Sequence, residues 1–542
     1  MKSPLAALAT ALVLPALLVL SGSRSPETCS VTLRLIDSKT GGELNGLLSV
    51  RDADGNGANV PELLSRGYGL EGKLGVETDA PIHRWSALLG KQTVTLPRAS
   101  LVLQAFSGLE TEVTTLRVDL TGKTHADISL PLVRFHNAKA EGFVAGNTHL
   151  HLMKIDREAA DRYLSEIPRA DGLDVLFLSY LERAGADQEY ISNRYTDGDL
   201  ASLTRRSDVK FGNGEEHRHN LDGYGEGYGH VMLLNIEKLI QPVSIGPGIM
   251  KRGTDGLPLQ RGIDAARSDG ATIVWCHNDL GTEAIPNLFA GRVDAQNIFD
   301  GSVRSSYKDS FYRYLNAGLN VPFSTGTDWF LYDFSRVYVD MQGQPTVESW
   351  LQSLADGKTY ITNGPLLTFT VDGQPIGTTL DLDQGGDVRI VARALGRLDF
   401  ERLELVQNGK VIKSVTTQLV GGHYQAELRM RLAVSKPCWL AVRTPPPSVA
   451  DDPELREPTP ENELGRELFA HTSAIFVDLQ GRRHFDESVA RELMAEAEAD
   501  QKLMANNALF ADAQERQRVL DVYRDGISAI QRHIERRRRT ER

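Results

Sequence analysis

Two histidines separated by one residue open the part of the sequence that could do chemistry. His149 and His151 stand in the stretch GNTHLHL, directly behind an apolar run. On a β-strand, side chains two residues apart point to the same face, so both imidazoles could bind one ion together. A pair of this kind is by itself more often structural or exposed than metal-binding. Its meaning therefore depends on what the rest of the chain brings to it.

Further potential ligands stand at the ends of other apolar runs. ATIVWCH ends in His277, VPFSTGTD ends in Asp328, and GYGH puts His230 in front of VMLLNI. The polar cluster NGEEHRHN adds Glu215 and Glu216. Taken singly, these residues have ordinary interpretations: a histidine bonded to the backbone, a cap residue, a charged loop. Their recurrence at strand ends favours one shared site, because ionisable groups there are costly unless they are paired.

The segments that carry these residues alternate between strand-like and helix-like sequence patterns. EGFVAGNTHLHL, LDVLFLSYLE, HVMLLNIE, ATIVWCHND and VPFSTGTDW are typical of buried strands. DREAADRYLSEIPRA, LQRGIDAARSDG and SSYKDSFYRYLNAG are typical of helices between them. Strand–helix alternation over this length predicts an α/β barrel or a doubly wound sheet. In a barrel, the carboxyl ends of the strands meet at one mouth, which would bring the candidate ligands together.

The sequence pattern changes on both sides of this middle region. With 542 residues the chain is too long for a single hydrophobic core. Short β-rich runs flank the middle region, Asn408-Gly409 is a strong hairpin signal, and the chain ends in a stretch rich in Ala, Glu, Leu and Arg. We predict a signal peptide at 1–23, an N-terminal β domain at 24–137, the α/β barrel at 138–365, a C-terminal β-sandwich-like domain at 366–480 and a helical tail at 481–542.

The N-terminus has the pattern of a secretory signal peptide. Lys2 precedes the uncharged apolar stretch PLAALATALVLPALLVL, and the small residues SGS at 21–23 offer a cleavage site. An uncleaved anchor is the alternative, because the stretch is nearly long enough to span a membrane. We expect an exported protein, whether periplasmic, extracellular or at the cell surface, with no stable membrane insertion after cleavage.

Net charge and cysteine content argue against two other classes of protein. The formal net charge is −12, whereas nucleic-acid binding needs a basic surface; only the C-terminal RHIERRRRTER is locally basic. Three cysteines, Cys29, Cys276 and Cys438, make neither a disulfide framework nor a thiolate metal site. Nucleic acid is therefore not an expected partner, and the oligomeric state stays open.

The order of the motifs resembles the PHP (polymerase and histidinol phosphatase) metallohydrolases. H-x-H, Gly-x-Glu, Gly-His, a strand-final His and a strand-final Asp follow one another over about 140–365. The flanking β domains and the TNGP segment at 362–365 look like the CehA/McbA-type branch of that family. The resemblance implies a multidomain fold: a distorted seven-stranded PHP-type α/β barrel flanked by N- and C-terminal β-sandwich-like domains and a C-terminal helical tail.

The resemblance also implies a set of metal ligands. Glu216 matches the family's Gly-x-Glu pattern, because Gly214 precedes it by two residues, and Glu215 is the alternative. Glu216 would bridge two ions. The implied ligands are His149, His151, Glu216 and Asp328 for the first ion, and Glu216, His230 and His277 for the second. Histidine mixed with carboxylate suits zinc, manganese or iron better than magnesium or calcium.

Three departures from the family pattern fall on its third metal site. Ser179-Tyr180-Leu181 stands where the family usually has Thr-Asp-His, and no histidine follows HLHL within the next residues. Trp329 and Phe330 follow Asp328 where a histidine is usual. Asp156 and Glu182 lie near these positions, but exposed carboxylates are the simpler interpretation. We therefore predict two divalent metal ions rather than three.

The resemblance implies a secreted hydrolase whose small-molecule substrate is a phosphoester, ester, amide or carbamate. Two adjacent ions can activate a water and stabilise the developing oxyanion. His217 and His219 are candidate proton shuttles, with exposed loop histidines as the alternative interpretation. Arg183, Arg218 and Tyr180 are candidate substrate-binding residues. Two rival hypotheses remain: a degenerate metal-containing protein that binds partners through its β domains, or histidines that bind no metal at all.

Overall fold

The computed structural model describes residues 28–70, 76–185, 189–222, 225, 227–302, 305–341, 343–448 and 460–541. The predicted signal peptide at 1–23 lies outside the described residues, as do residues 449–459 of the Pro-rich acidic stretch. Among the described residues, no helix is both long and apolar enough to cross a membrane.

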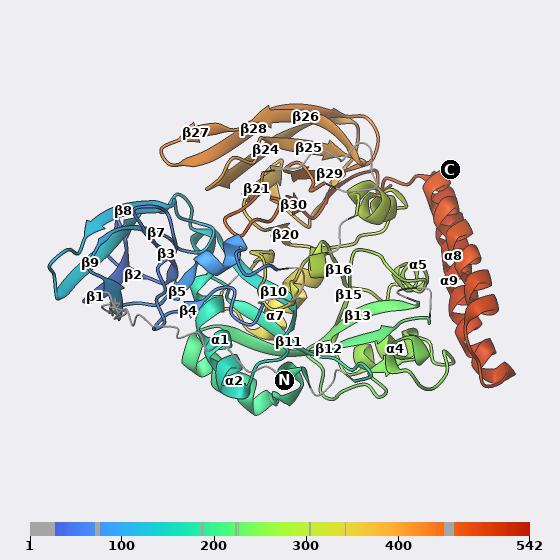
Figure 1. Cartoon of the computed structure of the whole chain (residues 1–542). Helices are drawn as coiled ribbons and strands as arrows, with labels where there is room; N and C mark the ends of the chain where they lie inside the picture. Colours follow the sequence, from blue (N-terminus) through green and yellow to red (C-terminus); the bar gives the residue numbers. More distant parts are fainter. Residues whose placement is uncertain are drawn as a thin grey trace, which may run out of the picture.

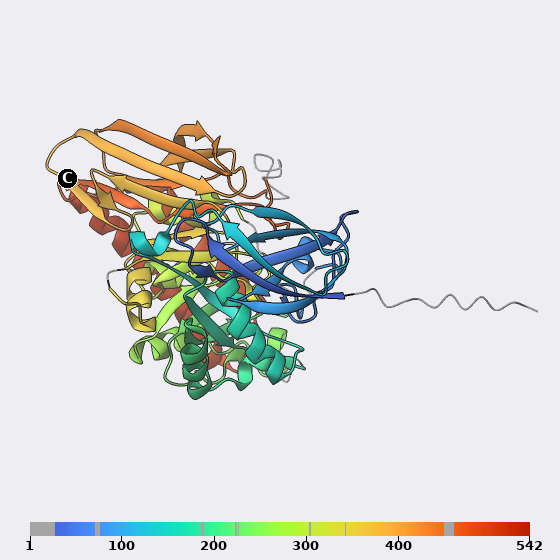
Figure 2. The ribbon, with the colours of Figure 1, turned by 90° about the vertical axis from the view of Figure 1, so that its left-hand side faces the viewer.

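The N-terminal part is a pair of β-sheets (Figures 1 and 2). One sheet consists of β1 (Thr28–Asp37), β2 (Glu43–Leu44), β6 (Gln92–Pro97) and β9 (His125–Leu132). The other consists of β3 (Gly46–Asp52), β4 (Leu64–Ser65), β5 (Ser86–Leu88), β7 (Ser100–Phe106) and β8 (Thr114–Asp119). Alternate residues of β1, Val31, Leu33 and Leu35, are fully buried in the core that both sheets share.

The middle of the chain forms a large curled sheet with mixed strand directions. Its strands are β10 (Phe143–His151), β11 (Val175–Tyr180), β12 (Lys210–His219), β13 (Gly229–Leu234), β14 (Ser244–Ile245), β15 (Thr272–Trp275), β16 (Ala295–Asn297), β17 (Phe323–Ser324), β18 (Asp328–Trp329), β19 (Arg336–Asp340) and β20 (Thr359–Thr362). β10 pairs with β11 along one edge and with β18 and β19 along the other, so the sheet curls back toward its own first strand. This curl brings strand ends that are far apart in sequence to one place.

Helices cover the outside of the curled sheet. They are α1 (Arg157–Ala170), α2 (Asp197–Ser207), α3 (Pro247–Met250), α4 (Gln260–Ser268), α5 (Ala284–Phe289), α6 (Arg313–Asn316) and α7 (Val347–Ala355). Trp350 of α7 donates a hydrogen bond to the Val144 carbonyl at 3.2 Å, and its ring contacts β10 at Gly146. A Cβ atom at Gly146 would lie 2.4 Å from the Trp350 ring, so glycine is required for this close approach. The contact fixes the strand that carries His149 and His151.

The large sheet continues past the predicted boundary at 365. β23 (Thr379–Leu382), β25 (Arg402–Gln407), β26 (Lys410–Thr416), β29 (Cys438–Arg443), β30 (Ala470–Thr472) and β31 (Ile475–Leu479) belong to it. A second sheet contains β21 (Leu366–Val371), β22 (Gln374–Pro375), β24 (Gly386–Gly396), β27 (Gln418–Val420) and β28 (His423–Val434). β20 pairs with β30, so the C-terminal β region is hydrogen-bonded to the middle sheet rather than merely tethered to it.

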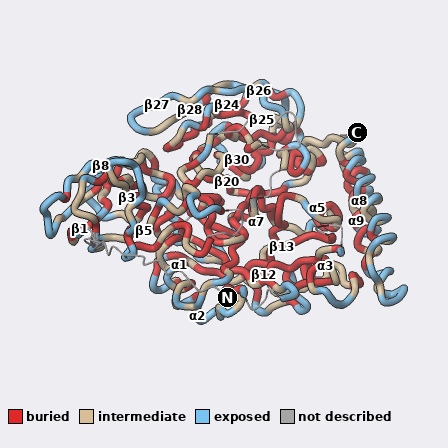
Figure 3. Tube along the Cα trace, in the orientation of Figure 1, coloured by how far each residue is buried: buried red, intermediate tan, exposed pale blue. Residues whose placement is uncertain are grey.

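A helical hairpin closes the chain. It consists of α8 (Glu487–Asn507) and α9 (Ala513–Glu541), which lie side by side and pack on α5 at the edge of the molecule (Figure 1). Figure 3 shows the contrast in burial between this hairpin, exposed along its outer side, and the strands of the curled sheet. The structure thus confirms a multidomain chain with a large curled α/β sheet, further β-sheets and a helical tail. A barrel of the PHP type stays a prediction.

Candidate metal centre

Ionisable side chains from several strands converge inside the curled sheet. Two groups of ligand atoms share Glu216, and a third joins His149 to Cys276 and Asp300; within each group all of the atoms lie within 4.8 Å of one another. The first group is His149, His151, Glu216 and Asp328, and the second is Glu216, His230 and His277. All six side chains are at least 92% buried. The structure therefore brings together every residue that the motif order suggested, in the two sets expected from it.

The first group lies between β10, β12 and β18. His149 Nε2 and His151 Nε2 are 3.0 Å apart, and His151 Nε2 is 3.1 Å from Glu216 Oε2. Asp328 Oδ1 lies 3.3 Å from His149 Nε2 and 3.7 Å from His151 Nε2. The two imidazoles lie on the same face of β10 because residues two apart on a strand point the same way. The parallel pairing of β10 with β18 puts Leu150 opposite Asp328.

The second group uses the other oxygen of the same carboxylate. His230 Nδ1 is 3.1 Å from Glu216 Oε1, and His277 Nε2 is 3.8 Å from it. His230 lies opposite Arg218 in the antiparallel pairing of β12 with β13, and His277 follows β15. Glu216 thus offers one oxygen to each group, which is the arrangement of a bridging carboxylate.

Backbone strain accompanies two of these residues. His277 and Asp328 adopt φ values of 54° and 61°, in the left-handed region that side chains other than glycine rarely occupy. Such outliers cost about 1–3 kcal/mol each and cluster at functional sites. Gly326 lets the loop before Asp328 pass against His149, since a Cβ there would lie 2.6 Å from the His149 Cβ. The local sequence STGTD at 324–328 is thus fitted to the site rather than to stability.

Asp300 is a functional candidate that the sequence reasoning missed. Its carboxylate lies 2.8 Å from His149 Nδ1 and 3.0 Å from His277 Nδ1, and it accepts the His277 backbone N–H at 2.9 Å. His151 Nδ1 donates in the same way to the Ser179 carbonyl at 2.9 Å. With Nδ1 protonated, each of the three rings turns an unprotonated Nε2 toward the centre, and a carboxylate or carbonyl behind a ligating histidine is the usual support of a metal site. The run AQNIFD, which also ends in an acid, was the available signal.

The electrostatics of the centre fit a cation. Burial would raise the pKa of Glu216, but Arg218 and the surrounding histidines outweigh it and lower that pKa well below its ordinary value. Burial would lower the pKa of His277, yet Asp300 and Glu216 raise it well above the ordinary value. Glu216 Oε1 and Asp328 Oδ1 are buried and accept no hydrogen bond from the described residues. Buried oxygens of this kind, facing the lone pairs of imidazoles, are costly unless a cation lies among them.

His217 and His219 do not reach this centre, so their prediction as proton shuttles is corrected here. Successive side chains of β12 alternate, and those of Glu215, His217 and His219 lie on the face opposite Glu216. His217 Nδ1 is 2.8 Å from Glu215 Oε1, and His219 Nε2 is 2.8 Å from Asp255 Oδ1. All are buried, so the alternative interpretation as exposed loop histidines is wrong as well. The same alternation removes Glu215 as the alternative bridging ligand.

The predicted substrate-binding residues differ in their distance from the centre. Arg218 shares the Glu216 face of β12, is 8% exposed, and has Nη1 3.4 Å from Glu216 Oε2 and Nη2 3.2 Å from Asn220 Oδ1. Tyr180 donates a hydrogen bond to Glu182 at 3.2 Å, and Arg183 is exposed. Arg218 is therefore a predicted substrate residue that the structure brings to the site, through its hydrogen bond to the shared Glu216 carboxylate.

Aromatic rings lie beside His151, and one of them belongs to Trp329, which follows Asp328 where the PHP pattern usually has a histidine. The Trp329 ring centroid is 5.2 Å from that of His151, and Tyr190 stacks on Trp329 at 5.7 Å. Asp156 caps the N-terminus of α1 by accepting the Ala159 N–H, and Glu182 accepts from Tyr180. Both carboxylates thus have structural roles, and neither belongs to a metal-compatible group among the described residues.

Comparisons with known proteins do not assign the chain to a family. No protein-family model matches the chain, and searches of curated proteins and of solved structures returned no match either. The resemblance to the PHP metallohydrolases accordingly stays a prediction. The finding that stands is a buried group of histidine, glutamate and aspartate side chains that could hold a metal ion.

Proposed function

We propose that this chain is an exported, metal-dependent hydrolase of small molecules. One observation carries the proposal: two groups of buried ligand atoms share the carboxylate of Glu216. Two divalent ions would be held there, one by His149, His151, Glu216 and Asp328, the other by Glu216, His230 and His277. Zinc, manganese or iron suits this mixture of imidazole and carboxylate. The signal-like N-terminus supports export.

When bound, such ions would act as Lewis acids toward a polarised substrate and lower the pKa of a nearby water toward neutrality. The chain's own residues prepare the centre for them. Asp300 and the Ser179 carbonyl hold the ring N–H groups of three histidines outward. The orientation of these rings is therefore set before binding, which reduces the ordering that the ions would have to impose.

Arg218 supports an anionic substrate or an anionic transition state. Three carboxylates, those of Glu216, Asp328 and Asp300, surround the centre. Two divalent ions together with the Arg218 guanidinium would exceed that negative charge and leave the site net positive. Because Arg218 is buried, its charge is weakly screened and can bind an oxyanion strongly. Phosphoesters, esters, amides and carbamates all develop such an oxyanion, so all four remain substrate classes of the proposal.

The proposal is tested by metal analysis combined with assays of one protein preparation. Purified protein loaded with Mn²⁺ or Zn²⁺ is analysed for metal and assayed on p-nitrophenyl phosphate, bis-p-nitrophenyl phosphate and p-nitrophenyl acetate. We expect about two ions per chain and hydrolysis of at least one substrate. The matched variants are His149→Ala, which should lose both, and His125→Ala, an exposed histidine outside the centre, which should keep both.

The other outcomes discriminate between the rival hypotheses. Protein that holds metal but hydrolyses none of the substrates would favour a binding protein over an enzyme. Less than about one ion per chain, unchanged in His149→Ala, would contradict the metal centre itself.

A further inference from the structure

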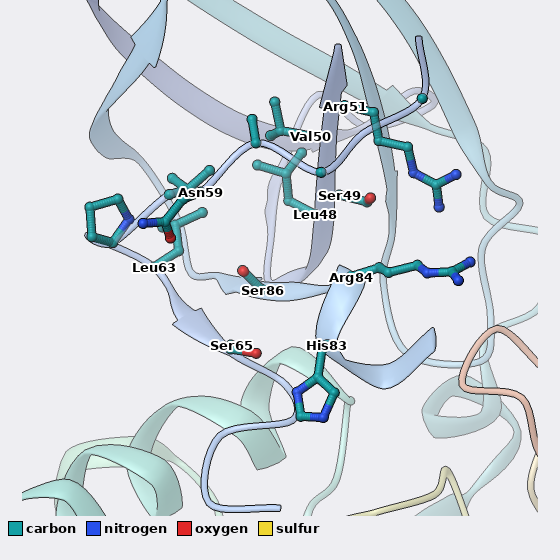
Figure 4. Close-up of a pocket in the computed structure, with 15 residues that line it drawn as sticks. Leu48, Ser49, Val50, Arg51, Asn59, Leu63, Ser65, His83, Arg84 and Ser86 are labelled. Atoms are coloured by element: carbon teal, nitrogen blue, oxygen red, sulfur yellow. The ribbon is translucent and has the colours of Figure 1, made fainter. Parts of the chain in front are cut away.

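A pocket in the N-terminal β domain is lined by polar side chains that have no hydrogen-bond partner among the described residues. It encloses about 570 Å³, within the size range of small-molecule sites. Its walls come from β3, the segment 55–63, β4, the short 3-10 helix Pro81–Arg84 and β5 (Figure 4). None of the metal-centre residues lines it, so it is a separate feature of the molecule.

The polar lining is cationic and contains no acid. Arg51 and Arg84 line the pocket, and Figure 4 shows their side chains extending toward the same side of it. Within the described part of the chain, neither guanidinium has an ion-pair or hydrogen-bond partner. No aspartate or glutamate is among the lining residues, although the whole protein carries a net charge of −12. A concave surface with paired cations and no carboxylate attracts an anion.

Neutral polar groups surround the two arginines. The hydroxyls of Ser49, Ser65 and Ser86 and the amide of Asn59 line the same pocket, and in the described structure none of these four side chains is hydrogen-bonded to the protein. Ser49 is only 2% exposed, so its hydroxyl opens onto the pocket from a buried strand position. Ser65 and Ser86 are half-buried. Hydroxyls that face the pocket without a partner among the described residues are open to a ligand, and several together favour one that is itself rich in oxygen.

Apolar residues complete the lining. Leu48, Val50, Val60 and Leu63 also border the pocket, and all four belong to the hydrophobic core of the N-terminal domain. An apolar surface rimmed by donors fits a sugar ring, whose C–H face packs on hydrocarbon while its hydroxyls hydrogen-bond around the edge. The two arginines would take a carboxylate or phosphate on that ring, because a guanidinium matches the geometry of such oxyanions.

We infer that the Arg51–Arg84 pocket is a binding site for a small acidic saccharide, a hydroxyl-rich ring that bears a carboxylate or phosphate. The site goes beyond the proposed hydrolase function and does not depend on it. It assigns a recognition role to a domain that the sequence presented only as a flanking β-sandwich.

The test is calorimetric titration of the full-length protein with four probes: glucuronate, glucose 6-phosphate, glucose and inorganic phosphate. We expect saturable binding of both acidic sugars. The uncharged glucose and the ring-less phosphate should each bind at least about tenfold more weakly, since each lacks one set of charge-assisted or hydroxyl contacts. Each titration is repeated in His149→Ala protein, where unchanged binding excludes the metal centre as the site.

Matched variants assign the binding to the pocket. Arg51→Gln/Arg84→Gln should weaken the acidic sugars about tenfold or more. The control Arg389→Gln/Arg393→Gln removes two arginines from β24 on the other β region and should change nothing. Absence of saturable binding of either acidic sugar at millimolar concentration would overturn the inference, as would equal binding in the pocket double variant. Equal affinity for phosphate and the acidic sugars would overturn the saccharide assignment.

Discussion

The two faces of β12 carry the same residue types but differ in how completely the buried side chains are hydrogen-bonded. On one face, Glu215 lies 2.8 Å from His217 and accepts the Ile240 N–H at 2.7 Å, and His219 lies between Asp255 and the Tyr228 N–H. On the other face, Glu216 and Asp328 each keep a buried oxygen without a hydrogen bond from the described residues. Residue type alone therefore does not distinguish the two faces, whereas the presence of buried oxygens without a hydrogen bond does.

The largest effect should separate the two adjacent glutamates. Glu216→Gln removes the charge that both ligand groups share, so we expect hydrolysis to fall by at least about a hundredfold, a loss of several kcal/mol of transition-state stabilisation. Glu215→Gln should keep activity within about tenfold, because its partners lie on the other face. Steady-state kinetics of both variants with matched metal loading provides the measurement. Equal losses would remove the distinction between the faces.

The next effect concerns Asp300, which is hydrogen-bonded to two of the clustered histidines. Asp300→Asn weakens the anchoring of His149 and His277, and we expect metal affinity to drop about 10–100-fold while the fold persists. Competition with a fluorescent chelator measures the affinity. Asp309→Asn, at an exposed position of the same region, is the control and should leave affinity unchanged. If the Asp300→Asn protein binds metal normally, Asp300 serves only the hydrogen bonding of the folded chain and does not position metal-binding residues.

A smaller effect should appear on the opposite face, and in stability rather than in metal binding. His219→Ala leaves Asp255 Oδ1 without its imidazole partner, so we expect a loss of about 1–3 kcal/mol in the free energy of unfolding. Urea denaturation at fixed metal concentration measures it, with metal content followed in parallel. Loss of metal in this variant at unchanged stability would reverse the assignment of the two faces.

The smallest effect is a difference in pH dependence in metal-free protein. Burial lowers the pKa of His219 against the pull of Asp255, so the folded protein binds fewer protons there than the unfolded chain. Its contribution to stability is present above the unfolded pKa of about 6.5 and is lost as the pH falls below it. His277 behaves in the opposite way: burial lowers its pKa, the carboxylates outweigh burial and raise it, and its contribution is lost as the pH rises through the raised value.

These opposite signs are measurable as slopes of stability against pH. One proton contributes at most about 1.4 kcal/mol per pH unit. In chelator-treated protein, His219→Gln should reduce the loss of stability on acidification below about pH 6.5. His277→Gln should instead reduce the loss on raising the pH. Identical slopes in the two variants would mean that the two histidines titrate in similar surroundings.

Much of the architecture followed from the sequence because its apolar runs are long or alternate cleanly. β6 and β7 coincide with the runs QTVTLP and SLVLQAF, and α1 begins one residue after its N-cap Asp156. Asn408 and Gly409 form the expected turn, with φ values of 50° and 84°. The predicted boundary at 365 is less sharp in the structure, since the pairing of β20 with β30 joins segments about a hundred residues apart.

β12 was not predicted as a strand because its last five residues, EEHRH, show no hydrophobic alternation. Both of its faces are buried, and polar side chains are tolerated there only because each face has its own partners elsewhere in the fold. The six side chains that cluster around Glu216 could be predicted from strand-end positions and from the motif order of the family resemblance. The face to which the His217 and His219 side chains point could not be predicted, because it follows from the alternation of β12, whose last residues were not recognised as a strand. Asp300 follows a strand of three residues, too short to show periodicity.

The most direct test of the central claim is anomalous diffraction from crystals of the full-length protein grown with Mn²⁺ or Zn²⁺. The account predicts two anomalous peaks, one on each side of the Glu216 carboxylate, among His149, His151 and Asp328 and between His230 and His277. Absence of peaks among these six side chains, or a single peak on the Glu215 face of β12, would contradict it.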